Sequence, residues 1–184
     1  KEKREVIVVD DGSKDRTAET ARRFKGARVV LQENKGPASA RNKGAREAKG
    51  DLLVFTDADC IPTPSFLREL VRPLKDSGVG GVQGRYATKQ EEAVARLVQL
   101  EIEERYERMK NSRELDWIGT YAGAFRKKDF FELGGFDEGY KTSSGEDPDF
   151  SYRLQEAGKR LAFNPNAIVF HTHPTTWARY FWTK

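Results

Sequence analysis

The sequence is poor in several features whose scarcity excludes whole classes of protein. It has one cysteine in 184 residues, so no internal disulfide can form, which fits a reducing compartment such as the cytoplasm. No apolar run approaches the ~18 consecutive residues of a membrane span. The Lys- and Glu-rich start also lacks the apolar stretch of a signal peptide. We therefore expect a cytoplasmic chain that neither crosses a bilayer nor carries a secretion signal.

The sequence does contain enough apolar material for one folded core. Hydrophobic residues make up 37% of the chain and charged residues 34%, with 11 Phe, 6 Tyr and 3 Trp. With no internal repeat and no flexible linker, we expect a single domain over residues 1–184. The net charge of +4 favours a polyanionic partner, which can be nucleic acid, an anionic membrane surface or a phosphorylated small molecule.

Short apolar runs alternate with longer amphipathic segments along the chain. The predicted strands are 5–9, 28–32, 52–56, 80–87, 118–125, 161–163 and 167–170. The predicted helices are 14–25, with Ser13 as its cap, 37–49, 64–76, 91–110, 127–133 and 147–157. Strands alternating with helices are typical of an α/β fold built on a parallel sheet.

Acidic residues stand at the ends of two predicted strands. In open α/β sheets the ligand crevice lies at the carboxyl ends of the strands. Asp57 and Asp59 would project to the same rim, where their oxygens suit Mg²⁺ or Mn²⁺ shared with a diphosphate. Asp11 would accept hydrogen bonds from a ligand's ring N–H or hydroxyls. The alternative is that these residues only form turns and helix caps.

A second candidate site lies at the start of the helix predicted from residue 37. Small residues there leave room for a phosphate at the helix N-terminus, and Arg41 would add a bidentate contact. The alternative is a solvated basic residue.

Further acidic and imidazole groups lie in the last third of the chain. Glu146, Asp147 and Asp149 gather at a helix N-terminus, where an ionised carboxylate facing a cleft can act as general base; capping is the alternative. The only two histidines, His171 and His173, follow the last predicted strand. Either can complete a metal site or serve a structural role.

Taken in order, these motifs resemble the family 2 glycosyltransferases, inverting enzymes with the nucleotide-diphospho-sugar-binding GT-A fold. The resemblance covers nearly the whole chain. It is carried by VVDDGSKD (8–15), NKGPASARNKG (34–44), FTDAD (55–59), GTYAGAFR (119–126), GGFDE (134–138), GED (145–147) and YRL (152–154).

The resemblance implies roles for the residues on the donor side. Asp11 would contact the nucleotide base, commonly uracil, and Arg41 would lie near the base or the diphosphate. Asp57 would bind ribose or metal-bound water. Asp59 would ligate a divalent cation, Mn²⁺ or Mg²⁺, that bridges the two phosphates, and His171 would complete the metal site. The nucleotide-binding part is expected at about residues 1–90.

On the acceptor side, at about residues 91–184, the resemblance implies that Asp147 deprotonates the acceptor hydroxyl and that Glu146 supports it. Polymer-forming relatives carry a Gln-x-x-Arg-Trp motif after the Glu-Asp pair, and this chain lacks it. We therefore expect transfer of one sugar at a time, onto a glycan or lipid-linked acceptor in cell-surface polysaccharide or glycolipid synthesis.

The chain departs from the family pattern at its start. Family members begin with a strand of the type apolar-apolar-Pro-x-Tyr-Asn and a helix ahead of the Asp-Asp-Gly-Ser strand. Here the sequence starts just upstream of Asp10. From the resemblance we expect that first strand and helix to be missing from this chain.

Aromatic and basic residues mix at the other end. On a helix Trp177, Tyr180 and Phe181 would share one face, with Arg179 and Lys184 beside them. That pattern suits a peripheral contact with a membrane interface or packing of a terminal helix on the domain.

Three other functions fit parts of the sequence. A sugar-nucleotide pyrophosphorylase shares the fold, but its Gly-rich, Arg-containing phosphate loop is not found here. The chain can also be a non-catalytic nucleotide-sugar-binding domain or a basic nucleic-acid-binding domain. The acidic strand ends argue against nucleic acid.

Overall fold

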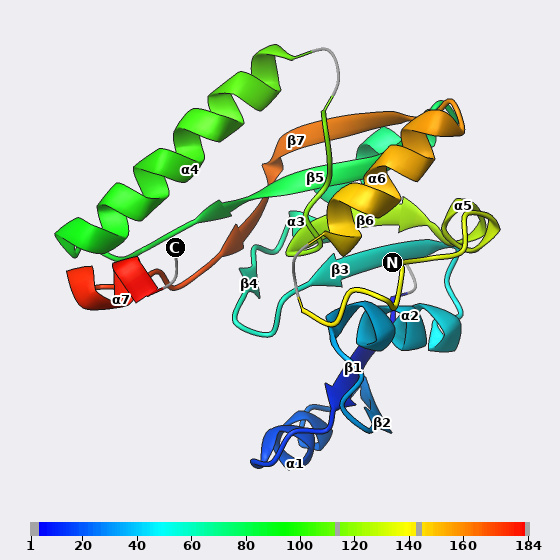
Figure 1. Cartoon of the computed structure of the whole chain (residues 1–184), viewed down its shortest axis with the longest axis horizontal. Helices are drawn as coiled ribbons and strands as arrows, with labels where there is room; N and C mark the ends of the chain where they lie inside the picture. Colours follow the sequence, from blue (N-terminus) through cyan, green and yellow to red (C-terminus); the bar gives the residue numbers. More distant parts are fainter. Residues whose placement is uncertain (1–3, 113–114, 143–144, 183–184) are drawn as a thin grey trace.

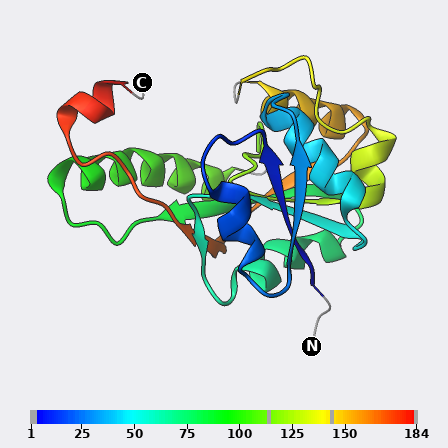
Figure 2. The same ribbon diagram turned by 90° about the horizontal axis from the view of Figure 1, so that it is seen from below.

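The computed structural model describes residues 4–112, 115–142 and 145–182 (Figure 1). Its strands form two sheets. The smaller sheet pairs β1 (Val6–Asp11) with β2 (Ala27–Gln32) in parallel, connected by the short helix α1 (Thr17–Arg22). Figure 2 shows these two strands side by side from below.

The larger sheet has five strands in the order β3-β6-β5-β7-β4. These strands are β3 (Leu52–Thr56), β4 (Ile61–Pro62), β5 (Val79–Ala87), β6 (Ala122–Arg126) and β7 (Arg160–Phe170). Only β5 and β7 run parallel, while β3 with β6, β5 with β6 and β4 with β7 are antiparallel. The α/β fold is confirmed, but the larger sheet is mixed where a mostly parallel one was expected.

Helices cover both faces of the larger sheet. The helices after α1 are α2 (Pro37–Glu47), α3 (Phe66–Val71), the 3₁₀ helix η1 (Arg72–Lys75), α4 (Ala93–Asn111), α5 (Lys127–Glu132), α6 (Glu146–Glu156) and α7 (Trp177–Trp182). Figure 1 places α6 in front of the sheet and α3 behind it, with α2 between the two sheets. No helix in the described ranges is long and apolar enough to cross a membrane.

The core has two halves because successive side chains of a strand point to opposite faces. Phe125 belongs to one half, with Phe130, Phe136 and Phe150 packed around it at ring-centroid distances of 5.1–6.4 Å. Its neighbour Ala124 belongs to the other half, beneath α3. The sheet is therefore buried on both sides, which holds its strand ends in place.

Three local predictions were wrong for identifiable reasons. Ser13 caps no helix: its N–H donates to Asp10 Oδ1 at 2.8 Å in a turn, and the helix begins at Thr17. The predicted strands 161–163 and 167–170 are one continuous strand, β7, since Pro165 lies within an extended segment. The predicted strand 118–125 begins only at Ala122, because the residues before it are bonded to side chains instead of to a neighbouring strand.

At one end of the larger sheet, β3 and β7 end close to the points where α2 and α6 begin. The parts expected at 1–90 and 91–184 share this sheet, since β3 and β5 of the first pair with β6 and β7 of the second. This arrangement brings together residues more than 100 positions apart.

Candidate functional site

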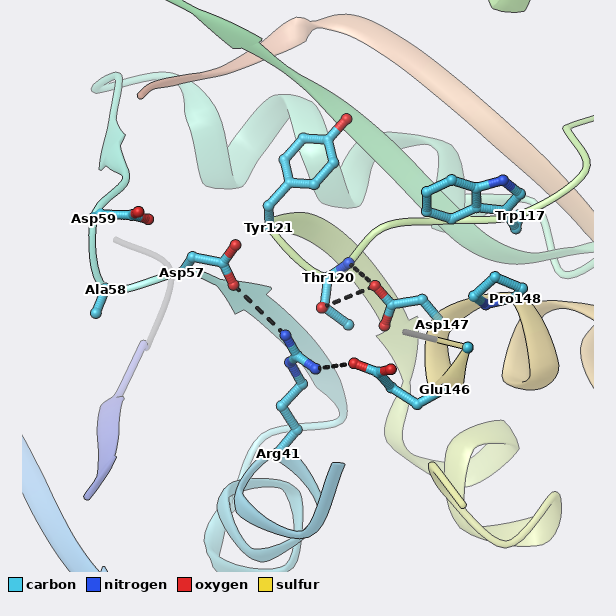
Figure 3. A pocket seen from close by; sticks show the side chains of 11 residues that line it. Arg41, Asp57, Ala58, Asp59, Trp117, Thr120, Tyr121, Glu146, Asp147 and Pro148 are labelled. Carbon is cyan, nitrogen blue, oxygen red and sulfur yellow. Dashed lines mark hydrogen bonds and ion pairs between the residues drawn. The ribbon is translucent and has the colours of Figure 1, made fainter. Parts of the chain in front are cut away.

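A pocket of about 580 Å³ opens at this end of the sheet, within the size range of small-molecule sites. Figure 3 shows Asp57 and Asp59 on one side, Glu146 and Asp147 on the other, and Arg41 between them. The pocket is lined by Arg41, Asp57, Ala58, Asp59, Trp117, Thr120, Tyr121, Gly145, Glu146, Asp147 and Pro148.

Arg41 reaches the pocket because α2 starts on a glycine. Gly36 has φ +93°, and a Cβ there would lie 2.8 Å from the carbonyl oxygen of Lys141, so only glycine fits. Pro37 follows at the first helical position, where its missing N–H costs nothing. One turn later, Arg41 points into the pocket.

The guanidinium of Arg41 joins the two acidic sides. Its Nη1 lies 2.7 Å from Glu146 Oε1, and its Nη2 lies 3.7 Å from Asp57 Oδ1. Glu146 is 2% exposed, so this ion pair offsets the cost of burying its charge. The described lining holds four carboxylates and one guanidinium. An anionic ligand therefore needs added positive charge to bind here.

The two carboxylate oxygens of Asp147 differ: one accepts hydrogen bonds and the other accepts none from the described residues. Its Oδ2 accepts from the backbone N–H and the hydroxyl of Thr120, at 2.9 and 3.1 Å, which fastens the 118–121 loop over α6. Its Oδ1 is buried without a hydrogen-bond partner among the described residues. Burial, reinforced by the charge of Glu146, raises the pKa of Asp147 to about 6. A carboxylate with such a pKa is suited to accept a proton near neutral pH.

Asp57 and Asp59 follow β3 in a turn closed by the N–H of Cys60 on Asp57 O, at 3.1 Å. Burial and the charge of Asp59 raise the pKa of Asp57. The acidic and thiol atoms of Asp57, Asp59 and Cys60 lie within 4.8 Å of one another. Burial and the two carboxylates raise the pKa of the Cys60 thiol to about 11. The thiol stays protonated at neutral pH, so the carboxylate oxygens are the atoms available to ligate a metal.

His171 follows β7 and lies directly against this acidic turn. Its Nε2 is 3.2 Å from Asp59 Oδ2. Asp59 and His171 offer an oxygen and a nitrogen that suit Mn²⁺, Asp57 lies beside Asp59, and the excess negative charge favours a cation. These residues therefore fit a divalent metal. His173 is turned away, buried at 4% exposure against Gln99.

Asp11, like His171, is a predicted site residue outside the pocket lining. Its Oδ1 accepts from Lys35 N at 2.9 Å and Gln32 Nε2 at 2.6 Å, and its Oδ2 accepts from Gly36 N at 2.9 Å. Asp11 thus holds the turn into α2. Three of the roughly four lone-pair positions of a carboxylate are in use, which leaves one for a ligand.

Sequence reasoning missed the roles of Thr120, Tyr121 and Tyr86. The Tyr86 hydroxyl is 3.5 Å from Asp57 Oδ2, and its ring stacks on Tyr121 at 3.9 Å between centroids. The quoted 119–126 motif marked the right loop for two of these residues. Tyr86 carries no local signal, because β5 and β6 become neighbours only through sheet pairing.

Comparison with known proteins gives one family. Residues 1–133 match the family model described as Glycosyl transferase family 2. A pre-mycofactocin glycosyltransferase of Mycobacterium tuberculosis is 34% identical over 181 residues, which is 92% of this chain and 38% of that protein. A poly-beta-1,6-N-acetyl-D-glucosamine synthase of Staphylococcus aureus is 30% identical over 185 residues, 95% of this chain and 44% of that protein. The chain thus spans less than half the length of these relatives.

Two solved structures share the fold. A mannosyltransferase from Pyrobaculum calidifontis, in complex with GDP-Man and Mn²⁺, superposes with a TM-score of 0.77 at 24% identity, over 96% of this chain and 50% of that one. GalNAc-T7 with UDP, GalNAc and Mn²⁺ superposes with a TM-score of 0.69 at 22% identity, over 92% of this chain and 38% of that one.

Proposed function

Because the chain belongs to glycosyl transferase family 2, we propose that it transfers a sugar from a nucleotide-diphospho-sugar to an acceptor hydroxyl with inversion of configuration. One observation carries the proposal: the acidic turn of Asp57 and Asp59 lies on one side of the pocket and the carboxylate of Asp147 on the other (Figure 3). Inversion needs the base and the leaving group on opposite sides of the sugar. The two sides of this pocket meet that need.

On the leaving-group side, Asp59 and His171 would hold a divalent cation, with Asp57 beside them. A bound cation would neutralise the negative charge that grows on the departing diphosphate. The four carboxylates of the lining make such neutralisation necessary, because one Arg41 does not balance them. The two structural neighbours, solved with Mn²⁺ and a nucleotide or nucleotide sugar, support this role. Mn²⁺ is the cation we propose to test first.

On the acceptor side, Asp147 would take the proton of the attacking hydroxyl on Oδ1. Oδ2 stays bonded to Thr120, which holds the carboxylate in place during the transfer. Glu146 keeps Arg41 oriented toward Asp57, at the edge where the diphosphate would lie. Asp147 is thus the catalytic base, and Glu146 a positioning residue for Arg41.

For the nucleotide we propose a uridine diphosphate. Asp11 has one lone-pair position left, and a carboxylate acceptor matches the single ring N–H of uracil. The acceptor would be a glycan or a lipid-linked sugar.

Calorimetric titration of UDP and GDP into the chain, with Mn²⁺ or with EDTA, tests the donor side. We expect UDP to bind only with Mn²⁺ and Asp59→Ala to abolish that binding. Asp51→Ala, at the exposed opposite end of β3, is the matched control and should bind as the wild type does. Equal binding in EDTA, or by Asp59→Ala, would refute the metal site. A screen of nucleotide sugars for Mn²⁺-dependent hydrolysis then identifies the donor sugar.

We also propose a peripheral contact of α7 with the cytoplasmic face of a membrane. Trp177, Phe181 and Trp182 are 54%, 70% and 90% exposed, and Arg179 lies among them. Aromatic rings beside a basic residue suit a lipid headgroup region. In flotation with anionic liposomes, the wild type should rise with the liposomes and the triple variant Trp177→Ser/Phe181→Ser/Trp182→Ser should stay at the bottom. Equal flotation of the two proteins would show that α7 does not make the membrane contact.

A further inference from the structure

Behind His171 lies a chain of hydrogen bonds that reaches α4, outside the pocket. It passes from His171 to His173 and from His173 to Gln99. The residues of this hydrogen-bond chain come from two places, the segment after β7 and helix α4. Tyr86, at the end of β5, packs its ring 4.6 Å from the His171 ring. None of these three residues lines the pocket, so the hydrogen bonds that join them need a separate explanation.

The orientation of the Gln99 amide can be read from its neighbours. The amide nitrogen lies 2.9 Å from Glu103 Oε1 and 3.4 Å from the carbonyl oxygen of Tyr86. Both of these groups are acceptors only, so the donor end of the amide must face them. The amide oxygen of Gln99 is therefore the atom presented to His173.

The oxygen of Gln99 decides where His173 carries its proton. It lies 2.9 Å from His173 Nε2 and can only accept, so that nitrogen must be protonated. A neutral ring protonated on Nε2 has a lone pair on Nδ1. Gln90 clamps the backbone of the same residue, accepting from His173 N at 2.6 Å and donating to His173 O at 3.0 Å.

The lone pair of His173 in turn decides the state of His171. The two Nδ1 atoms are 3.2 Å apart, so His171 must supply the proton between them. A neutral His171 protonated on Nδ1 has its lone pair on Nε2. In this tautomer the lone pair faces Asp59 Oδ2, 3.2 Å away, and both atoms are acceptors. A proton or a cation between them removes the repulsion of the two acceptors.

We propose that Gln99, acting through His173, is a positioning residue that holds His171 in the tautomer whose Nε2 is free to ligate a divalent cation beside Asp59. The inference rests on the proposed function for the cation itself. Partners that orient a ligating imidazole are typically worth 10–100-fold in metal affinity. Here that partner lies two side chains away from the metal, on a helix that does not line the pocket.

The wild-type protein without metal gives the first test. Because the chain has two histidines, a long-range ¹H–¹⁵N spectrum with labelled histidine contains two ring systems, which His173→Gln assigns. We expect His171 to be protonated on Nδ1 and His173 on Nε2. A spectrum in which His171 lacks the proton on Nδ1, or His173 lacks the proton on Nε2, would overturn the inference. This measurement involves neither sugar nucleotide nor metal, so its outcome is separate from that of the proposed function.

A second test asks whether Gln99 determines the tautomers of His173 and His171. Gln99→Met keeps the length of the side chain and removes the acceptor. We expect both rings to become mixtures of tautomers and Mn²⁺ affinity, measured by electron paramagnetic resonance of the free ion, to fall about 10–100-fold. Glu104→Gln, an exposed substitution on the same helix whose carboxylate lies 3.7 Å from Arg108, is the control and should change neither. Unchanged tautomers or unchanged affinity in Gln99→Met would refute the positioning role.

Discussion

Replacing the proposed base by its amide, Asp147→Asn, should remove activity and at the same time raise stability. The pKa of Asp147 is raised from 3.8 to about 6, so at neutral pH the folded state holds an anion that it disfavours. A shift of about 2 units corresponds to about 3 kcal/mol. The amide nitrogen would take the place of Oδ1, which has no partner among the described residues, and an unsatisfied donor costs about 1–3 kcal/mol.

The net expected gain for Asp147→Asn at pH 8 is about 0–2 kcal/mol, or up to about 8 °C in Tm for a chain of this size. The sign depends on pH. Because the folded-state pKa is raised, wild-type stability from this group is full below about pH 4 and is lost as the pH rises through 6. The advantage of Asn should therefore be present at pH 8 and absent at pH 4.

Thermal unfolding at both pH values measures this difference. Asp149→Asn on the same helix is the control: its carboxylate accepts from Arg153 Nε at 3.0 Å, so it should bring no gain at either pH. Transfer by Asp147→Asn should fall about 10²–10⁴-fold while donor binding is kept, and wild-type kcat/KM should fall tenfold per pH unit below about pH 6. An active Asn variant would refute the base; a gain equal at pH 4 and pH 8 would refute the burial argument.

Three further substitutions probe the frame of the site, each followed by urea unfolding. Arg41→Met should cost about 3–5 kcal/mol because it leaves Glu146 buried without a partner, and adding Glu146→Gln should recover most of it; no recovery would contradict the ion-pair argument. Gly36→Ala should cost about 1–3 kcal/mol from backbone strain alone, more with the clash on Lys141, and a neutral result would show that the turn can relax. Phe150→Ala should cost about 3–5 kcal/mol, since its fully buried ring packs on three others; a loss under 1 kcal/mol would mean that the cluster closes around the gap.

The sequence was sufficient for the residues whose placement depends on local structure. Asp57 and Asp59 follow an apolar run, and Glu146 and Asp147 begin a helix, so each could be assigned to one edge of the fold from its position alone. Arg41 followed from the Gly-Pro helix start. The structure brings all five to one pocket. Their assigned chemical roles remain predictions.

Pairing within the larger sheet could not be obtained in the same way. Alternating strands and helices predict an α/β fold, but not that β6 lies antiparallel between β3 and β5. Strand direction and order depend on which apolar faces meet across the core, and those contacts join residues far apart in the chain. The loop at 118–121 was read as strand for the same reason, because its bonding to Ser151 and Asp147 is tertiary.

The sequence by itself therefore determined the α/β class, the family and the acidic residues of the site, since each depends on short motifs with fixed local geometry. Only the tertiary structure decided how those groups act on one another. It buried Glu146 against Arg41 and connected His171 through His173 to Gln99. It also left Asp147 Oδ1 without a hydrogen-bond partner among the described residues. Burial and hydrogen-bond direction depend on neighbours supplied by distant segments, and no local pattern specifies them.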